Sequence, residues 1–256
     1  MALVSHAVPS GTTATVTPIV ALDVADRASA EALVRRLGSA CDFYKVGLEL
    51  FSAEGPSVVA WLRDQGKRVF VDLKLHDIPN TVRGAARSVA RHGATLLTVH
   101  ASGGPEMIAA AVAGAAEGAP GGGSEPACGI LGVTILTSLN AAAVGTAWGR
   151  EAVEVTTEVV RLAGFAASAQ AAGIVCSGHE AAAVRAAYGA QLGLLIPGIR
   201  LPGGDAHDQA RVMTPSAAAA AGARWLILGR AVTGAADPVA AMAAVRADLG
   251  GVAASA

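Results

Sequence analysis

The ten-residue run 72–81 holds the densest group of side chains that could carry acid–base or electrostatic chemistry. It reads Asp-Leu-Lys-Leu-His-Asp-Ile-Pro-Asn-Thr. Asp72 and Lys74 lie two residues apart in a strand-like segment, so both should point to the same side and pair. Lys45, on a neighbouring predicted strand, can reach the same carboxylate, and Asp23 ends another strand. Alternating charges in a partly desolvated pocket hold one another in place. A purely structural ion-pair network is the alternative interpretation.

Two short Gly-Arg segments have the composition of a phosphate site. One ends at Arg200, within Pro-Gly-Ile-Arg, and the other contains Gly229 and Arg230. Glycine lets backbone N–H groups approach phosphate oxygens, and arginine binds them with two parallel hydrogen bonds. Gln209 lies between the two segments and could bridge the phosphate and the rest of a ligand. These segments predict a phosphorylated substrate.

The elements that must position these residues alternate along the chain. Eight short β-rich apolar runs are separated by stretches of helical character. The runs span residues 19–23, 43–47, 68–74, 95–100, 129–136, 173–177, 192–197 and 224–229, and helices are expected over 29–37, 56–65, 82–92, 105–117, 153–172 and 238–249. Nearly continuous apolar strands are typical of a parallel sheet covered by helices. Eight such units favour an α/β fold, a single-domain (β/α)8 TIM barrel, over an open doubly wound sheet.

The candidate residues follow the ends of these runs, where barrel enzymes carry their chemistry. We expect a tail over 1–18, the barrel over 19–250 and a second tail over 251–256. The Gly-rich segment 118–126 precedes a strand and is expected to be a turn on the opposite face.

Composition excludes several classes of protein. Nineteen Lys and Arg against twenty Asp and Glu give a net charge of −1, and no apolar stretch approaches the ~20 residues of a membrane span. Binding to nucleic acid or to a membrane is therefore not expected. Three widely spaced cysteines indicate neither a disulfide framework nor a zinc site, and the first 17 residues lack a secretory pattern. We expect a cytoplasmic protein without a bound metal.

The motifs together resemble one enzyme family. The run 72–81, preceded by Ala-Leu-Asp23 and Lys45-Val-Gly and followed by the two Gly-Arg segments, is similar to orotidine 5'-phosphate decarboxylases over residues 19 to about 248. The resemblance implies a homodimeric carboxy-lyase that converts orotidine 5'-phosphate to UMP and CO₂, the last step of de novo pyrimidine biosynthesis. It also implies that no cofactor or metal takes part.

The resemblance assigns catalytic roles to four charged residues. Lys74 corresponds to the proton donor at pyrimidine C6, and Asp72 to the carboxylate placed against the departing carboxylate. Lys45 and Asp77 complete the tetrad. In this family the second aspartate crosses the dimer interface, so Asp77, with Thr81 beside it, is expected to serve the partner's site.

The same resemblance assigns the binding residues. Asp23, with Lys45, would bind the ribose hydroxyls, and either Thr137 or Ser138 would contact the pyrimidine amide. The phosphate would be held by Arg200, Gln209, Gly229 and Arg230.

Two other functions remain open at the level of sequence. A metal-dependent sugar-phosphate lyase of the same superfamily shares the Asp72, Lys74, Asp77 pattern. Such relatives carry Glu as a magnesium ligand at the position of Lys45, where an ammonium group would repel a divalent cation. A barrel that binds UMP-like nucleotides without catalysis is the other alternative, although every chemical position of the motif is filled.

Overall fold

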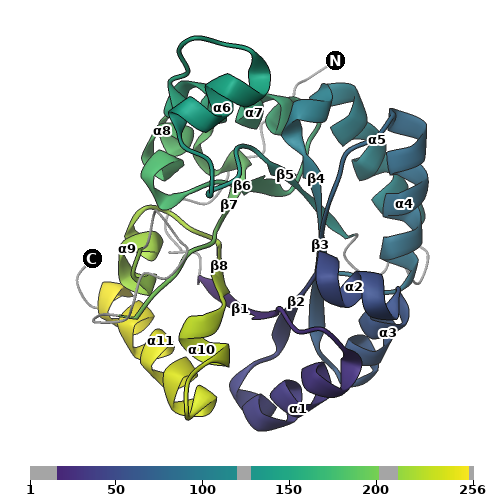
Figure 1. The fold of residues 1–256 in the computed structure, drawn as a ribbon, viewed down its shortest axis with the longest axis vertical. Coiled ribbons are helices and arrows are strands. Elements are labelled where there is room, and N and C mark those ends of the chain that lie inside the picture. The colour runs from purple at the N-terminus through teal and green to yellow at the C-terminus, as the bar shows by residue number, and fades with distance from the viewer. Residues whose placement is uncertain (1–15, 120–127, 202–212, 254–256) are drawn as a thin grey trace, which may run out of the picture.

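The structure is a computed structural model that describes residues 16–119, 128–201 and 213–253. Eight parallel strands form a closed barrel in sequence order (Figure 1), which confirms the predicted (β/α)8 fold. The strands are β1 (Thr17–Leu22), β2 (Phe43–Gly47), β3 (Arg68–Leu75), β4 (Leu96–His100), β5 (Gly129–Val133), β6 (Gly173–Val175), β7 (Gly193–Ile196) and β8 (Trp225–Leu228). Because β8 pairs with β1, with Ile227 opposite Ile19, the barrel has no open edge.

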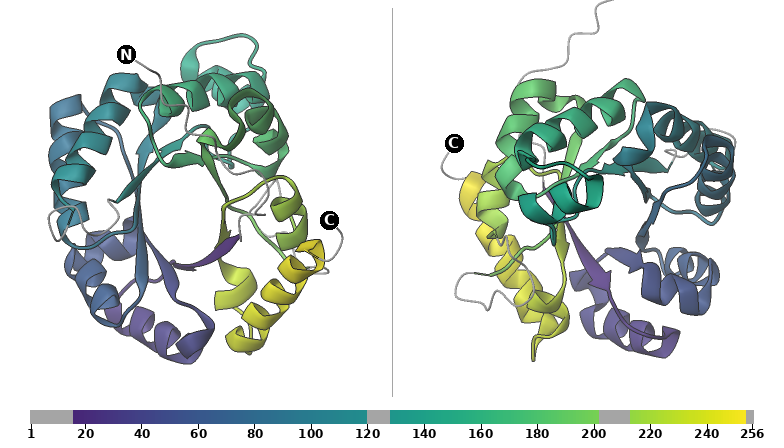
Figure 2. Two further views of the ribbon diagram at one scale, coloured as in Figure 1. Left: turned by 180° about the vertical axis from the view of Figure 1, so that it is seen from behind. Right: turned by 45° about the horizontal axis from the view of Figure 1, so that its top comes forward.

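Helices surround the strands on the outside in every view (Figures 1 and 2). They are α1 (Arg27–Leu37), α2 (Leu48–Glu54), α3 (Ser57–Asp64), α4 (Pro79–Arg91), α5 (Gly104–Glu117), α6 (Ala141–Trp148), α7 (Val155–Ser168), α8 (Gly178–Tyr188), α9 (Pro215–Ala220), α10 (Arg230–Thr233) and α11 (Pro238–Ala253). Each of the six helical stretches named from the sequence overlaps one of these helices. Parallel strands require such crossover connections, and the helices bury the outer faces of the strands.

Side-chain caps fix where several of these helices begin. Asp26 accepts a hydrogen bond from the backbone N–H of Ser29 at 2.8 Å and starts α1, directly after β1. Asn140 caps α6 in the same way. Ser177 and Glu180 form a reciprocal capping box at the start of α8. Such caps satisfy N–H groups that the first helical turn leaves without a partner, and they set the connections that follow the strands.

The inside of the barrel is filled by a separate apolar layer. Its buried members are Ile19, Phe43, Phe70, Leu96, Leu131, Leu195 and Trp225. At the amino ends of the strands, the Arg68 guanidinium lies 4.5 Å from the centre of the Phe43 ring, and that of Arg224 lies 4.6 Å from the Trp225 ring. Burial of each large apolar side chain contributes about 1.5–3 kcal/mol. This packed layer closes the barrel interior below the carboxyl ends of the strands, so a pocket can open only at those ends.

The ends of the barrel extend beyond the expected boundaries. Strand β1 begins at Thr17, inside the expected tail 1–18, and α11 continues to Ala253, inside the expected tail 251–256. Among the helices of the described residues, none has both the length and the apolar character needed to cross a membrane.

Candidate active site

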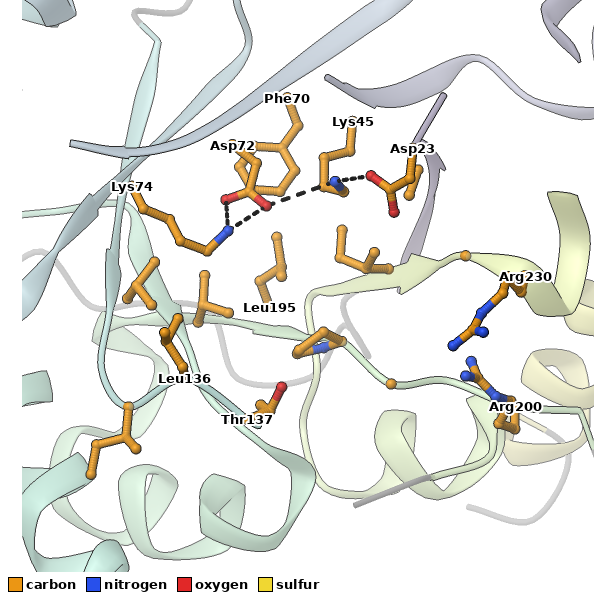
Figure 3. A pocket seen from close by; sticks show the side chains of 18 residues that line it. Asp23, Lys45, Phe70, Asp72, Lys74, Leu136, Thr137, Leu195, Arg200 and Arg230 are labelled. Atoms are coloured by element: carbon orange, nitrogen blue, oxygen red, sulfur yellow. Dashed lines mark hydrogen bonds and ion pairs between the residues drawn. The ribbon is translucent and has the colours of Figure 1, made fainter. Parts of the chain in front are cut away.

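A pocket of about 280 Å³ lies inside the barrel at the carboxyl ends of the strands (Figure 3). Charged side chains lie at its two ends, and apolar side chains lie between them. The lining residues are Ala21, Asp23, Lys45, Phe70, Asp72, Lys74, Val133, Ile135, Leu136, Thr137, Val175, Leu195, Pro197, Gly198, Arg200, Ile227, Gly229 and Arg230. Eight residues proposed from the sequence are among them: Asp23, Lys45, Asp72, Lys74, Thr137, Arg200, Gly229 and Arg230.

Four charged side chains from three adjacent strand ends form a continuous row along one wall. Lys45 Nζ lies 2.7 Å from Asp23 Oδ1 and 3.8 Å from Asp72 Oδ2. Lys74 Nζ donates to both carboxylate oxygens of Asp72 at 2.9 Å. The side chains of Lys45 and Asp72 are only 10% and 14% exposed, whereas that of Asp23 is 63% exposed. Opposite charges therefore alternate along the row, and its centre is the most desolvated part.

The strand that carries Asp72 and Lys74 is irregular at that point. Val71 pairs with Leu97 of β4, but the next pair joins Leu75 to Val99. Lys74 also has φ of +50°, in the left-handed region that side chains with a Cβ rarely adopt. The ion pair therefore rests on a β-bulge and a strained backbone, rather than on the simple alternation of a regular strand. Residues held in such conformations cluster at functional sites.

The opposite end of the pocket is cationic. Figure 3 shows the guanidinium groups of Arg200 and Arg230 pointing toward one another across this end. Arg200 is buried, and its backbone N–H donates to the carbonyl of Met213 at 2.9 Å. Gly198 has φ of +76°, a conformation that suits glycine, and Gly229 precedes the short helix α10. Two facing guanidinium groups next to a glycine-containing backbone form a site suited to a phosphate dianion.

Thr137 lies on the pocket wall across from the charged row, after β5 (Figure 3). Ser138 is exposed and does not line the pocket. The structure thus brings only the first of these two candidates to the pocket. Leu136, Leu195 and Ile227 add apolar surface that the sequence reading did not assign.

Asp77 and Thr81 lie apart from the pocket of their own chain. Asp77 is exposed, and its Oδ1 accepts a hydrogen bond from the backbone N–H of Ile78 at 2.6 Å, just before α4. Thr81 is exposed within the first turn of α4. Gln209 lies outside the described residues. Three residues of the tetrad proposed from the sequence, Lys45, Asp72 and Lys74, therefore line this chain's pocket, and Asp77 does not.

One polar residue next to the site was missed by the sequence reading. Thr98 is fully buried in β4, and its hydroxyl contacts both the Asp72 carboxylate and the Lys74 backbone. The sequence feature that could have identified Thr98 is its position as the single hydroxyl residue within the otherwise apolar part of the strand Leu-Leu-Thr-Val-His. A hydroxyl group buried in such a strand needs a hydrogen-bond partner.

The two histidines nearest the charged row contact each other rather than the pocket. The ring centres of His76 and His100 are 5.5 Å apart. Burial lowers the pKa of His100, and the nearby His76 and Lys74 lower it further. This environment favours neutral imidazole at His100.

Other reactive side chains do not form a second centre within the described residues. Cys176 is fully buried, and burial raises its pKa to about 12, so it is not poised as a nucleophile. In residues 16–119, 128–201 and 213–253, no three His, Cys, Asp or Glu side chains are grouped as metal ligands.

The pocket as a whole suits a ligand with a phosphate at one end and a largely apolar, planar group in the middle. The facing arginines can hold the phosphate, while the apolar wall can contact a ring. The ammonium group of Lys74 then lies at the other end, fixed by Asp72 and able to stabilise negative charge that develops on a reacting atom.

A sequence model of the Orotidine 5'-phosphate decarboxylase / HUMPS family matches residues 17–245. The orotidine 5'-phosphate decarboxylase of Anaeromyxobacter sp. (strain K) is 52% identical over 232 residues, which cover 90% of this chain and 96% of the relative. That of Moorella thermoacetica is 47% identical over 231 residues, covering 90% and 91%.

Comparison with solved structures gives the same grouping. The crystal structure of orotidine 5'-phosphate decarboxylase from Lactobacillus acidophilus superimposes with a TM-score of 0.81 at 34% identity. The match covers 91% of this chain and 98% of that one, so the similarity extends over the whole barrel.

Proposed function

The chain belongs to the Orotidine 5'-phosphate decarboxylase / HUMPS family, and from this premise we propose that it decarboxylates orotidine 5'-phosphate to UMP and CO₂. The reaction completes the de novo synthesis of pyrimidine nucleotides. The observation that carries the proposal is the Asp23, Lys45, Asp72, Lys74 row facing the two-arginine end of the pocket. By resemblance, the metal-dependent sugar-phosphate lyases carry a magnesium ligand at the position of Lys45, where an ammonium group would repel a divalent cation.

Lys74 is the proposed proton donor. When the bond between C6 and the carboxylate breaks, CO₂ leaves and the electron pair remains on C6 in an orbital outside the ring π-system. The ring cannot delocalise this pair, so a fixed positive charge must stabilise it. The Nζ of Lys74 supplies that charge and then transfers a proton to C6, which gives UMP. Its two hydrogen bonds to Asp72 hold the ammonium group in place before the reaction.

Asp72 has a second proposed role toward the substrate. Its carboxylate lies against the position of the departing carboxylate, and the repulsion favours loss of that charge as neutral CO₂. Binding of the distant phosphate offsets the cost of placing two carboxylates together. The other proposed assignments follow the family resemblance: Asp23 and Lys45 bind the ribose, Thr137 binds the pyrimidine amide with Ser138 as the alternative, and the phosphate is held by Arg200, Gln209, Gly229 and Arg230.

The functional unit is proposed to be a homodimer in which Asp77 and Thr81 complete the partner's site. Their exposure outside their own pocket supports this arrangement, because a side chain absent from its own site is free to reach a neighbouring one. Ile78, between them in sequence, is 67% exposed, as expected for an apolar residue that a partner covers. The dimer is proposed to act in the cytoplasm, where the three free, buried cysteines remain reduced.

The deciding experiment follows the ultraviolet absorbance of orotidine 5'-phosphate after addition of EDTA-treated protein, with Lys74→Ala as the matched control. Rapid loss of absorbance with the parent protein and none with Lys74→Ala supports both the reaction and the role of Lys74. Near-normal turnover by Lys74→Ala would rule out this mechanism. Activity that returns only with magnesium would indicate a metal-dependent lyase, and tight UMP binding without turnover would indicate a non-catalytic barrel.

A further inference from the structure

Thr98 occupies the one position of β4 that faces the bulge of β3. Val71 pairs with Leu97, and Leu75 pairs with Val99. The single residue between the two β4 partners is Thr98, whereas three residues, 72–74, separate the two β3 partners. Thr98 is completely buried, so its hydroxyl must find its hydrogen bonds within the protein.

The Thr98 hydroxyl makes one bond to each of the two residues that frame the bulge. Its Oγ1 accepts a hydrogen bond from the backbone N–H of Lys74 at 2.9 Å. The same Oγ1 donates to Asp72 Oδ1, also at 2.9 Å. The hydroxyl therefore donates its single proton to the carboxylate of Asp72 and accepts the backbone N–H of Lys74 with a lone pair.

The bond to the backbone N–H bears on the strained conformation of Lys74. The bulge removes the regular ladder pairing between Val71 and Leu75, so the Lys74 N–H has no β4 carbonyl opposite it in a regular register. A φ of +50° at a residue with a Cβ persists only when its surroundings hold it there. The Thr98 hydroxyl supplies such a restraint, and the restraint sets where the Lys74 side chain leaves the strand.

The bond to Asp72 fixes the other half of the ion pair. Asp72 Oδ1 receives the Thr98 hydroxyl and the Lys74 ammonium, while Oδ2 receives Lys74 and faces Lys45 at 3.8 Å. A carboxylate with both oxygens engaged from different directions has little freedom to rotate. Its orientation is therefore set before any substrate enters.

We propose that Thr98 is a positioning residue for decarboxylation: its hydroxyl holds the bulge of β3 so that the Lys74 ammonium and the Asp72 carboxylate are fixed in their reactive geometry. This inference rests on the proposed function, because the geometry matters for the transfer of a proton to C6. Thr98 itself does not line the pocket, so it acts through its two neighbours.

The test compares Thr98→Val with Thr98→Ser. Valine keeps the shape of threonine and removes both hydrogen bonds, whereas serine keeps the hydroxyl. Thr95→Val is the matched control, because the Thr95 hydroxyl accepts from the Val69 N–H at 3.4 Å between the same two strands at their amino ends. We expect Thr98→Val to lower kcat on the order of 10- to 100-fold, as small misplacements of reacting groups do. KM for orotidine 5'-phosphate and the affinity for UMP should change less than about threefold, since the phosphate contacts remain.

The remaining variants decide whether positioning is the cause. Thr98→Ser should recover kcat to within about threefold of the parent, and Thr95→Val should keep it. Unchanged kcat in Thr98→Val would overturn the proposal, as would failure of serine to rescue or an equal loss of UMP affinity and kcat.

A structural readout separates this inference from the proposed function. Crystal structures of the two Thr98 variants should show the positive φ of Lys74 and its pairing with Asp72 kept with serine and lost with valine. If the parent protein did not decarboxylate orotidine 5'-phosphate, the proposed function would fail while these structures still showed whether Thr98 holds the bulge. Retention of the parent geometry in Thr98→Val would refute the role of Thr98 whatever the reaction is.

Discussion

Gly47 leaves the space that the ammonium group of Lys45 occupies. A Cβ atom at position 47 would lie 2.9 Å from Lys45 Nζ and 3.4 Å from Asp23 Oδ1. Gly47 has an ordinary φ of −91°, so the glycine is needed here for room rather than for backbone conformation. The ion pair between Lys45 and Asp23 thus depends on a glycine, which has no side chain, two residues after Lys45 in the same strand.

Gly47→Ala should therefore displace the Lys45 ammonium without unfolding the barrel, because the end of a lysine side chain can move more cheaply than backbone. We expect kcat/KM for orotidine 5'-phosphate to fall about tenfold or more, the effect of weakening one charged hydrogen bond. Steady-state kinetics measure this, with Gly250→Ala in α11 as the control for adding a methyl group where no neighbouring atom lies within 4 Å. Parent-like kinetics in Gly47→Ala would contradict the steric argument.

The positive φ of Lys74 predicts an unusual order of stability among inactive variants. In a regular strand glycine is less stable than alanine by about 0.5–1 kcal/mol. At Lys74 the left-handed backbone penalises any Cβ, so Lys74→Gly should be more stable than Lys74→Ala by about 1 kcal/mol. Urea denaturation of both proteins measures the difference, and a more stable alanine variant would show that the conformation carries no strain.

Arg230→Ala should weaken binding of the substrate through its phosphate. Loss of a charged hydrogen bond of about 1.5–3 kcal/mol raises KM for orotidine 5'-phosphate roughly 10- to 100-fold. Orotidine, which lacks the phosphate, should be converted slowly but equally by Arg230→Ala and the parent. Arg224→Ala, at the other end of β8 over the Trp225 ring, should leave both substrates unaffected. An equal loss for the two substrates would place Arg230 away from the phosphate.

A shared active site predicts recovery of activity on mixing two inactive variants. Lys74→Ala and Asp77→Ala damage different contributions to the same site, so a mixed dimer contains one intact site. Random exchange of subunits should restore about a quarter of the parent activity. Lys74→Ala mixed with Asp72→Ala is the control, because both residues come from the same chain and no intact site can form. No recovery in the first mixture would refute the shared site.

The environment of His100 predicts a pH dependence of stability. Its pKa is lowered, chiefly by burial and further by His76 and Lys74. The unfolded chain, with an ordinary histidine pKa of about 6.5, then binds more protons than the folded chain in weak acid. The free energy of unfolding contributed by His100 is therefore present above about pH 6.5 and is lost as the pH falls below it. Urea denaturation from about pH 7 to pH 5 should show a shallower loss in His100→Gln than in the parent, and an equal loss in the two proteins would contradict this role of His100.

Much of the fold was predictable because the sequence alternates so regularly. Eight apolar runs and the helical stretches between them led directly to the closed barrel, since buried parallel strands need apolar residues on both faces. The charged pairing of Asp72 with Lys74 also followed from spacing, although for an incomplete reason. The pairing arises on a bulge with a left-handed Lys74, and strand periodicity carries no information about either feature.

The remaining features depend on distances between strands. Thr98 lies 26 residues after Asp72 in sequence, and only the register of β3 against β4 brings its hydroxyl to the carboxylate. The selection of Thr137 over Ser138 for the pocket wall depends on the path of the chain after β5, where Leu136 and Thr137 line the pocket and Ser138 is exposed.

The pairing of β1 with β8 joins the two ends of the barrel's chain at the pocket. Asp23 follows the first strand and Arg230 follows the last, so the charged row and the arginine end of the pocket include residues from neighbouring strands that lie far apart in the sequence. A growing chain on the ribosome consequently has no complete pocket until its final strand has emerged and closed the ring. A nucleotide that contacts residues on both of these strands should stabilise the pairing of β1 with β8. Opening of the barrel between these two strands should therefore be slower when the nucleotide is bound.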